Sequence, residues 1–447
     1  MWHLDPLLKQ IYEMDGETMQ RCAQHLMLGG GTRGGPVLVR GKGVRVWDVD
    51  GKDYIDCTSQ SWALYLGYAN DDINAVIREH IERMTHIHQG FDTLPRYYLA
   101  KKLASLAPEG LNRVSFTVGG GPAIEAAMKV CIKNVPDARD FVCLHDGYHG
   151  TTLGTIGGSW VSTRANGRFM GGSRFLSLTH PFVRVPNPYT YRNPFGVDTE
   201  TYVDMCLTMA RETLERGIAG RPAGIIVEPI QASAGQVILP TRYLQGLRAL
   251  CDEFETLLVF DEIQTYARIG DWLAAGHFGV TPDIIVLGKA LGAGLPLAAI
   301  IIADGLEGFA PDTEELHTFA NPSLSMVTAA KQIALLEAGV LENCRLMGDY
   351  LGDALRGMMT EYPEIGDVRQ VGLHIGVEFV ADPQTKKPIP EQTGAIRDEG
   401  FRNGVFFGLG GVRPNVLKIK PPLIITRAEA DEVLGKFERC VRTVLRG

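Results

Sequence analysis

Lys289 stands where a lysine side chain could act as a nucleophile. It closely follows the apolar run Asp283–Leu287, and the glycine-rich segment Gly288–Gly294 surrounds it. Desolvation at the end of a buried strand lowers the pKa of an ammonium group, because it disfavours the charged form. A neutral amine is what Schiff-base chemistry requires. An ordinary surface lysine at a strand end is the plainer interpretation of Lys289 alone, so the other residues decide.

Asp261 is the second candidate for chemistry. It ends the apolar run Thr256–Asp261 and opens the motif Asp261-Glu-Ile-Gln264. A carboxylate at the end of a buried strand is costly unless it pairs with a cation. A protonated pyridine nitrogen would be such a partner. An ion pair with a nearby arginine is the alternative.

A run of three glycines could bind an anion. The segment Val118-Gly-Gly-Gly-Pro122 joins a predicted strand, Val114–Val118, to a predicted helix, Ala123–Asn134. We expect Pro122 at the first helical position, where its missing N–H costs nothing. Backbone N–H groups and the helix dipole at such a place bind phosphate groups. A tight turn without a ligand is the alternative.

Two further segments supply aromatic and polar groups. Asp146-Gly-Tyr148-His149-Gly150 follows the predicted strand Phe141–Leu144, and a tyrosine between glycines can lay its ring on a planar ligand. The segment His317-Thr318-Phe-Ala-Asn321-Pro322 offers a hydroxyl and an amide in a turn. Each segment alone is a weak signal, because most tyrosines in such a place only pack.

The composition limits the class of protein. The chain has 447 residues, of which 45% are apolar and 21% charged, so a large packed core is expected. The net charge of -8 argues against nucleic-acid binding. The eight cysteines are scattered without a C-x-x-C pair, which predicts neither a disulfide framework nor a metal site. No signal peptide and no run of about 18 apolar residues is visible, so we expect a cytoplasmic protein without a membrane segment.

The elements that must position these groups follow an α/β pattern. The predicted strands are Val114–Val118, Phe141–Leu144, Ala223–Glu228, Thr256–Asp261, Asp283–Leu287 and Leu297–Ala303. The predicted helices between some of them are Ala123–Asn134, Thr201–Arg216 and Tyr243–Glu255. Continuous apolar strands alternating with helices imply a mostly parallel sheet covered on both faces. Many of the candidate residues follow the C-terminal strand ends, where such sheets bind ligands.

The sequence predicts three parts. Residues 1–60 form an N-terminal segment that packs with the smaller domain and contains a hairpin turning at Asp50-Gly51. Residues 61–324 form the large domain, and residues 325–447 form a small C-terminal α+β domain. The small domain is expected to contain helices at Ser325–Gly339 and Arg345–Glu361, strands within Val368–Val380 and Val416–Ile425, and a last helix opened by a capping box at Thr426.

Together these segments resemble the class III aminotransferases, which are pyridoxal-phosphate enzymes of fold type I. The resemblance covers nearly the whole chain. It implies an α/β fold, with a large domain on a mostly parallel sheet covered by helices and a smaller α+β domain. It also implies pyridoxal 5'-phosphate as the cofactor. The order and spacing of six motifs carry it, namely Tyr148-His-Gly, Glu228-Pro-Ile-Gln, Asp261-Glu-Ile-Gln, Gly288-Lys289, Thr318 with Asn321-Pro322, and Pro421-Pro-Leu.

The resemblance implies a role for each motif residue. Lys289 would hold the cofactor as a Schiff base and later move a proton, and Asp261 would keep the pyridine nitrogen protonated. Thr318 would reach the phosphate of the neighbouring subunit, which implies a homodimer with active sites at the interface. The other implied cofactor contacts are Gly120 and Gly121 at the phosphate, Tyr148 and Ile263 on the two ring faces, Gln264 at the phenolic oxygen, and His149 and Glu228.

The phosphate loop departs from the family pattern. Where the family usually has Ser-Gly-Ser/Thr-Glu-Ala, this chain has Gly119-Gly-Gly-Pro-Ala123. The side-chain hydroxyl donors are missing there, so backbone N–H groups and Thr318 would carry more of the phosphate. We therefore expect weaker retention of the cofactor.

The candidate substrate residues are Trp62, Ser233 and Lys418, and two of them also depart from the pattern. Ser233 stands where many relatives have a glutamate, and Lys418 stands where many have an arginine. A lysine is a point charge and does not reproduce the bidentate fork that arginine offers to a carboxylate. An ordinary strand-surface lysine is the alternative for Lys418.

The first expectation is an aminotransferase that moves an amino group between a small amine or amino acid and a keto acid or aldehyde. The alternative is a lyase that eliminates ammonia plus phosphate or water from an amino-alcohol phosphate or phosphonate. A Lys-Ile-Lys-Pro-Pro stretch, here Lys418–Pro422, also occurs in the branch that contains such phospho-lyases. An epimerase or decarboxylase on the same scaffold, and a cofactor-binding protein without turnover, are further options.

Overall fold

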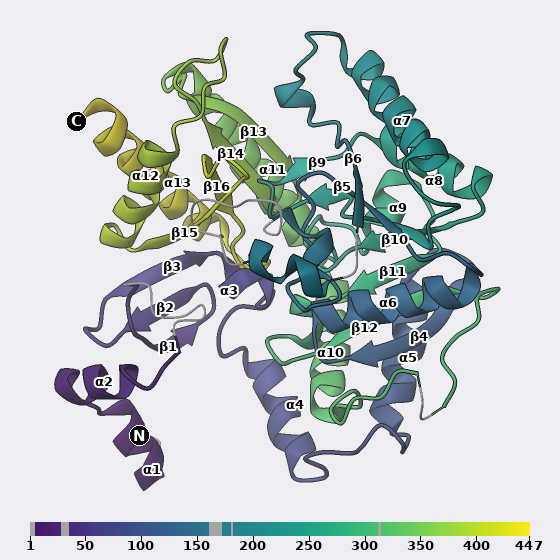
Figure 1. Ribbon diagram of the computed structural model, residues 1–447. Coiled ribbons are helices and arrows are strands. Elements are labelled where there is room, and N and C mark those ends of the chain that lie inside the picture. The colour runs from purple at the N-terminus through teal and green to yellow at the C-terminus, as the bar shows by residue number, and fades with distance from the viewer. Residues whose placement is uncertain (1–4, 28–34, 161–171, 180–181, 312–313) are drawn as a thin grey trace.

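The computed structural model describes residues 5–27, 35–160, 172–179, 182–311 and 314–447. Two seven-stranded sheets organise the described part of the chain (Figure 1). A third, two-stranded sheet consists of β8 (Ile230–Gln231) and β9 (Val237–Ile238).

The first sheet has the strand order β4-β12-β11-β10-β7-β5-β6. Neighbours among β11, β10, β7, β5 and β6 are parallel, whereas β12 is antiparallel to both β11 and β4. The predicted mostly parallel sheet is therefore confirmed. Its strands are β4 (Leu111–Thr117), β5 (Phe141–Leu144), β6 (Phe182–Val185), β7 (Gly224–Val227), β10 (Leu257–Asp261), β11 (Ile284–Leu287) and β12 (Ala298–Ala303).

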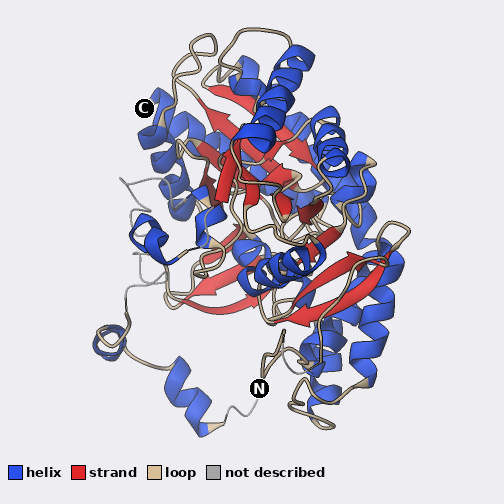
Figure 2. Ribbon diagram, turned by 45° about the vertical axis from the view of Figure 1, so that its right-hand side comes forward, coloured by secondary structure: helices blue, strands red, loops and turns tan. Residues whose placement is uncertain are grey.

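Helices cover both faces of this sheet, which explains its continuous apolar strands (Figure 2). In β10, Val259 packs in the cluster that contains the buried side chains of α6 (Gly120–Asn134). Its neighbours Leu258 and Phe260 point to the opposite face and pack in the cluster that contains α8 (Thr241–Glu253). Helix α5 (Leu94–Leu106) packs on β4 and α7 (Thr199–Arg216) packs on β6. The other helices of this part are α4 (Asp71–Ile81) and α9 (Ala274–Phe278).

Helix α6 begins three residues earlier than expected. It starts at Gly120 instead of Ala123, so Pro122 lies within the first turn and not at the first helical position. Proline is tolerated there because first-turn N–H groups have no partner inside the helix. The N–H groups of Gly120 and Gly121 are therefore available to a ligand.

The second sheet joins both ends of the chain and has the order β1-β2-β3-β15-β16-β14-β13. The predicted hairpin is confirmed, because β2 and β3 pair antiparallel and Gly51 in their turn has a φ of 80°. Strand β3 pairs parallel with β15. The boundaries at residues 60 and 324 stay predictions. The strands are β1 (Leu38–Lys42), β2 (Arg45–Asp48), β3 (Asp53–Cys57), β13 (Ile365–Val371), β14 (His374–Phe379), β15 (Val405–Gly410) and β16 (Val416–Ile419).

Three C-terminal details refine the expectations. The stretch Val368–Val380 is a hairpin, in which β13 and β14 pair across Gly372. Strand β16 ends at Ile419 because two prolines follow shortly after it, and proline cannot donate to a sheet. The capping box at Thr426 is confirmed, since its side chain accepts from the N–H of Glu429 and the Glu429 carboxylate accepts in return. Helices α12 (Pro390–Arg402) and α13 (Arg427–Arg446) complete this part.

The stretch Ser323–Thr360 is long and apolar enough to span a membrane by length and composition alone. It consists of α10 (Ser323–Leu335), a widened turn at Leu336–Val340 and α11 (Leu341–Gly357). Buried core helices of proteins without membrane segments pass the same test, and α10 and α11 both bury side chains in the main core cluster. The expected absence of a membrane segment stays a prediction.

Helices α1 (Pro6–Tyr12) and α2 (Gly16–Ala23) bury no residue and lie apart from the body in both ribbon views.

Candidate active site

A cavity of about 240 Å³ lies at the C-terminal ends of the parallel strands of the first sheet. All the predicted cofactor residues except Thr318 line it. Its lining residues are Gly120, Gly121, Tyr148, His149, Gly150, Thr151, Thr152, Glu228, Asp261, Ile263, Gln264 and Lys289.

Lys289 enters the cavity from the turn after β11, and its backbone has a φ of 47°, in the left-handed region. A lysine there is strained by about 1–3 kcal/mol, which the surrounding structure must offset. No described residue forms a hydrogen bond or ion pair with its Nζ atom, which lies 5.5 Å from the ring centroid of Trp62. Burial lowers the pKa of Lys289, while Asp261 and Glu228 act against that shift. The lysine therefore has the properties of an amine nucleophile.

Asp261 ends β10 and is oriented by two donors. The His149 Nδ1–H donates to its Oδ2 over 2.9 Å, and the N–H of Ile263 donates to its Oδ1 over 3.2 Å. The backbone N–H of His149 is held in turn by Ser159 Oγ at 2.9 Å. His149 was predicted as a cofactor contact. It lines the cavity and also fixes the carboxylate.

Glu228 is a second buried carboxyl group in the cavity wall. It accepts the N–H of Tyr148 over 2.8 Å and the N–H of Ala232 over 3.2 Å. Burial raises the pKa of Glu228 to about 7, and the charge of Asp261 adds to the increase while His149 opposes it. Asp261 is in hydrogen-bond contact with His149, whereas Glu228 accepts only backbone N–H groups from the described residues.

The start of α6 forms a cradle that only glycine can line. A Cβ atom on Gly120 would lie 2.9 Å from Cδ1 of Ile263, and one on Gly121 would lie 2.8 Å from Cγ2 of Thr152. No side chain caps this helix. Its first N–H groups and its dipole therefore face the cavity as an anion site.

The expectation that hydroxyl donors are missing near the phosphate loop is incomplete. Thr151 and Thr152 line the same cavity, although they belong to the loop after β5 and not to the glycine loop. Neither Thr151 nor Thr152 was predicted from the sequence. The available signal was their position directly after Tyr148-His149-Gly150.

The side-chain oxygen of Gln264 is bound by Lys420, a residue that was not predicted from the sequence. Lys420 Nζ lies 3.5 Å from Gln264 Oε1, which leaves the Gln264 Nε2–H₂ group for an acceptor in the cavity. Lys420 is fully buried, and burial together with the charge of Lys418 lowers its pKa well below the usual value. The available signal was its position two residues after Lys418, directly after β16.

Trp62 and Lys418 lie side by side next to the cavity. Trp62 belongs to the short turn α3 (Ser59–Trp62), whose four residues all have φ between 46° and 69°. Lys418 Nζ lies 4.8 Å from the Trp62 ring centroid, near Lys289. Lys418 is 7% exposed, so it is no ordinary surface lysine. Burial and the charge of Lys289 lower the pKa of Lys418 to about 8.

Ser233 is bound to a tryptophan that sequence analysis missed. The indole N–H of Trp160 donates to Ser233 Oγ over 2.9 Å. Trp160 packs with Ile156, and Tyr148 and Val412 lie against this pair. No periodic pattern in the sequence marks Trp160.

Thr318 is not brought to this cavity. It is exposed in a turn beside Phe319, and the turn is tied to the segment before α5. The Asn321 side chain donates to the carbonyl of Phe91 over 2.7 Å. Within the described ranges, no three His, Cys, Asp or Glu side chains form a metal-binding group.

The family model Aminotransferase class-III matches residues 33–441. This chain belongs to the class III aminotransferases. It is 33% identical to the adenosylmethionine-8-amino-7-oxononanoate aminotransferase of Geobacter sulfurreducens, over 92% of this chain and 93% of that protein. It is 32% identical to the leucine/methionine racemase of Thermococcus litoralis, over 92% and 91%. An amine transaminase from an uncultivated Pseudomonas species, solved in its PLP-bound form, has a TM-score of 0.84 at 26% identity, over 94% and 99%.

The class III aminotransferase uses pyridoxal 5'-phosphate, and the cavity fits that cofactor. An unpaired lysine amine, an oriented carboxylate and an uncapped helix start lie around one small cavity. These groups match an aldehyde, a pyridine nitrogen and a phosphate. The family and its relatives favour amino transfer over the alternative of elimination.

Proposed function

We propose that this class III aminotransferase uses the cavity beside Lys289 to move an amino group between a small amine or amino acid and a keto acid or aldehyde. The observation that carries the proposal is that Lys289, with its lowered pKa, shares a cavity with Asp261 and the start of α6. Bound pyridoxal phosphate supplies an aldehyde for the amine and a ring that withdraws electrons from the substrate Cα.

Lys289 has two tasks in this proposal. Between turnovers its amine would hold the cofactor covalently. As a free amine it would take the proton from the substrate Cα and deliver it to a carbon of the cofactor. The lowered pKa supports both tasks, because only the neutral amine can act as a nucleophile or a base.

Asp261 holds a proton at the pyridine nitrogen. His149 supports this role, since its Nδ1–H occupies one carboxylate oxygen and fixes the orientation of the other. Each carboxylate oxygen has two acceptor positions, so Asp261 can accept from the ring while it keeps its protein donors.

The remaining cavity residues would bind the phosphate of the cofactor and orient its ring. The N–H groups of Gly120 and Gly121, with the hydroxyls of Thr151 and Thr152, hold the phosphate. Tyr148 and Ile263 line the same cavity and would cover the two ring faces, and Gln264 would donate from Nε2 to the phenolic oxygen.

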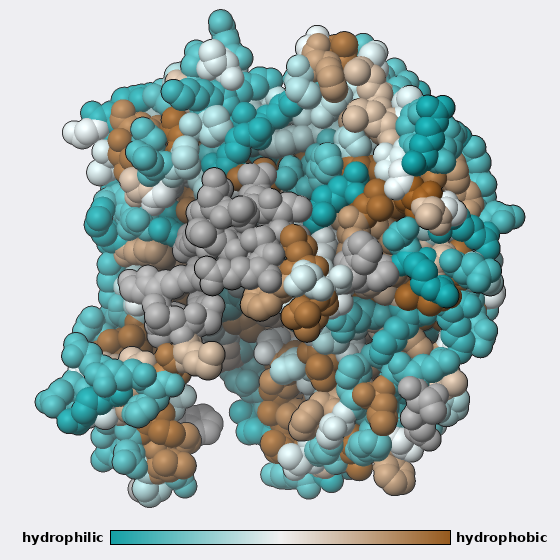
Figure 3. Space-filling view, viewed as in Figure 1, coloured by the Kyte–Doolittle hydropathy of each residue, from teal (hydrophilic) through white to brown (hydrophobic). Residues whose placement is uncertain are grey.

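The enzyme is also proposed to be a homodimer in which Thr318 reaches the phosphate of the partner. Large apolar side chains are exposed around Thr318, with Leu94 82% and Phe319 60% exposed. Brown patches lie over the lower part of the body in the region of α4 and α5 (Figure 3). An apolar surface of this kind is rare on monomers and typical of subunit interfaces. A second copy of the chain is the occupant we propose. The exposed apolar residues are Phe91, Leu94, Tyr97, Tyr98, Leu316 and Phe319.

The reaction is tested by incubating the yellow holoenzyme with candidate amines and no keto acid. An aminotransferase converts its cofactor and stops after one equivalent, whereas a lyase continues and releases ammonia. A racemase, the activity named for one relative, inverts the substrate without consuming it. Continued turnover or inversion without an acceptor would contradict the proposal.

Lys289→Ala tests the site. We expect the covalent cofactor absorbance to disappear and turnover to fall at least about 10²–10⁴-fold, the usual contribution of a positioned base. Lys42→Ala is the control, because Lys42 is exposed and pairs only with the surface residue Asp71 and a backbone carbonyl. Steady turnover in Lys289→Ala would overturn the assignment.

A further inference from the structure

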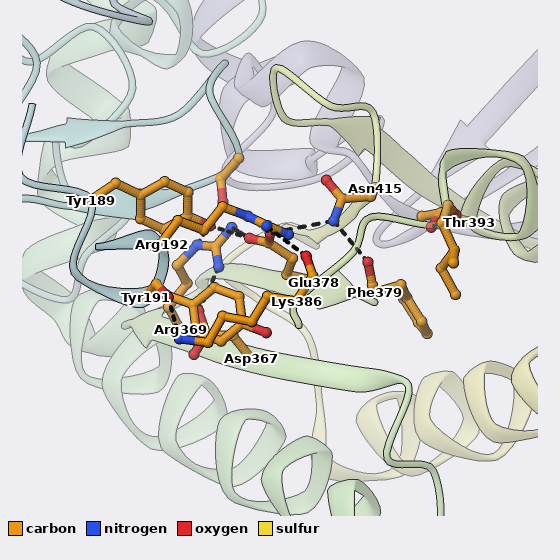
Figure 4. A network of polar contacts seen from close by, with 12 residues as sticks. Tyr189, Tyr191, Arg192, Asp367, Arg369, Glu378, Phe379, Lys386, Thr393 and Asn415 are labelled. Carbon is orange, nitrogen blue, oxygen red and sulfur yellow. Dashed lines mark hydrogen bonds and ion pairs between the residues drawn. The ribbon is translucent and has the colours of Figure 1, made fainter. Parts of the chain in front are cut away.

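A buried polar cluster joins the segment after β6 to strands β13 and β14 of the second sheet (Figure 4). Glu378, in β14, is 1% exposed and lies at its centre. We call this group the Glu378 cluster, and it consists of Tyr189, Arg192, Asp367, Arg369, Glu378 and Asn415.

The cluster holds Glu378 from several directions. Arg369 NH2 donates to its Oε2 over 2.8 Å, and the Tyr189 hydroxyl donates to the same oxygen. Arg192 Nε donates to Oε1 over 2.6 Å, and Asn415 Nδ2 donates to Oε1 over 3.3 Å. Burial by itself would raise the pKa of Glu378, but Arg369 and Arg192 keep it below its usual value. The cluster therefore carries real charges inside the protein.

Arg369 uses its third nitrogen outside the cluster. Its Nε–H donates to the carbonyl oxygen of Gly235 over 2.8 Å. Gly235 belongs to the turn between β8 and β9, which we call the 232–236 turn. A planar guanidinium that is fixed by Asp367 and Glu378 can place this third donor in only one position.

The backbone of the 232–236 turn is closely packed at Gly235. The φ of Gly235 is 115°, and a Cβ atom there would lie 2.9 Å from Val416 Cγ2 and 3.2 Å from Arg369 NH2. The N–H of Gly411 also donates to the carbonyl of Ser233 over 3.2 Å. The turn is thus held between the Glu378 cluster and the loop before β16.

The same turn contacts the cofactor cavity on its other side. Its Ser233 Oγ accepts the indole N–H of Trp160, which packs near Tyr148. Its Ala232 N–H donates to Glu228, and Glu228 accepts the N–H of Tyr148. The turn is therefore connected to the cavity wall by one hydrogen-bonded route through Glu228 and by a second route in which Trp160 packs near Tyr148.

Stability alone is a weak reason for this cluster. Removing charges from water costs several kcal/mol per ion, and buried ion pairs are often no more stable than apolar replacements. What a fully hydrogen-bonded arginine provides is fixed geometry. The group whose position it fixes is the carbonyl of Gly235.

We propose that Arg369 is a positioning residue for the substrate side of the active site, which acts through the 232–236 turn to fix Ser233 against Trp160. This inference rests on the proposed function, since it takes the cavity beside Lys289 as the active site. Arg369 does not touch the substrate. It sets the KM for the amine by holding the wall against which the amine binds.

Arg369→Gln is the main test. We expect the KM for the amine to rise about tenfold, the usual effect of losing a charged hydrogen bond. We expect kcat to change less than about threefold, because Lys289 and Asp261 are held by other contacts. Asp367→Asn is the matched control, since Arg369 keeps its bonds to Gly235 and Glu378, and its KM should stay within about twofold of wild type.

A double-mutant cycle with Trp160→Phe separates the positioning of Ser233 by Arg369 from a general loss of stability of the protein. Phenylalanine has no N–H for Ser233 to accept, so Arg369→Gln should change KM less than about twofold in that background. A full tenfold effect there would overturn the route through Ser233. Ser233→Ala should raise KM as Arg369→Gln does. If Arg369→Gln does not fold, the KM for the amine is measured in Arg369→Lys and in Ser233→Ala, each with and without Trp160→Phe.

Hydrogen exchange of the holoenzyme gives a measurement that does not depend on turnover. Amides of residues 230–238 should exchange at least about threefold faster in Arg369→Gln, and at the wild-type rate in Asp367→Asn. Unchanged exchange and KM with only a lower Tm would mean a purely structural role and would overturn the inference. Failure of the wild-type enzyme to convert any amine would instead contradict the proposed function, and the exchange result would still decide the role of Arg369.

Discussion

Gly120 controls how closely a phosphate can approach the start of α6. A Cβ atom in Gly120→Ala would lie 2.9 Å from Cδ1 of Ile263, which lines the cofactor cavity, so the end of this side chain must shift. Overpacking of this kind costs about 1–3 kcal/mol, and we expect the Kd of the cofactor to rise about tenfold. The measurement is a titration of apoenzyme with pyridoxal phosphate, followed by visible absorbance.

Gly119→Ala is the matched control for that change. The Gly119 backbone is extended, and a Cβ atom there would meet only Pro122 Cδ at 4.0 Å. Its cofactor affinity should equal that of the wild-type enzyme. Equal affinity in Gly120→Ala would show that Ile263 does not support the ring.

The sequence predicted the residues that carry a local signal. Asp261 ends an apolar strand and Lys289 closely follows another, where a charge is costly, and both line the cavity. Trp160 and Lys420 were missed because their importance depends on partners far along the chain, Ser233 and Gln264. No spacing within one segment encodes such a pair.

Glu262 fixes the start of the short helix α9. Its carboxylate accepts the N–H groups of Ala274 and Ala275 and the hydroxyl of Thr265, and all of these lie in the core. Burial raises the pKa of Glu262 to about 7. The folded protein therefore binds this proton more tightly than the unfolded chain does.

Glu262→Gln should flatten the dependence of stability on pH. Because the pKa is raised in the folded state, the stabilisation is present at low pH and is lost as pH rises toward 7. One such group contributes a slope of up to about 1.4 kcal/mol per pH unit, which the variant loses. Urea unfolding between pH 5 and pH 8, as roughly the window of this titration, measures the slope.

Two comparisons show whether a change in the slope comes from Glu262. Glu228 has a similarly raised pKa and remains in the variant, so part of the slope should persist. Glu79→Gln removes an exposed carboxylate and should leave the slope unchanged. An identical slope in Glu262→Gln would mean that Glu262 is charged in the folded protein.

Elements with strong patterns were predicted and weak ones were not. The strands β5, β7, β10, β11 and β12 are continuous apolar runs, and each was expected within one or two residues of its observed bounds. Strand β6 was missed because it lies at the sheet edge, is only partly buried and contains Arg184, so it is not a continuous apolar run. The start of α6 was misplaced because glycine has no side chain to mark it.

The proposed dimer is tested on the exposed face of α5. Leu94→Glu places a charge where an apolar partner surface is expected, so the variant should be monomeric in analytical ultracentrifugation. It should also bind the cofactor more weakly, because Thr318 of the second copy is lost. Met209→Glu alters a 47% exposed apolar residue on α7 and should leave the assembly intact. A dimeric Leu94→Glu variant with unchanged cofactor affinity would contradict the proposed interface.

The pairing of the second sheet has a consequence for how the chain is made. Strand β3 and the Trp62 turn come from the first part of the chain, but β3 pairs with β15, and Lys420 lies against Trp62. The first sheet needs no residue beyond Ala303, so it can form while synthesis continues. The N-terminal strands must wait, unpaired on one edge, until β15 has been synthesised and has left the ribosome. Trp62, one of the earliest site residues to be translated, is therefore among the last to be fixed in place.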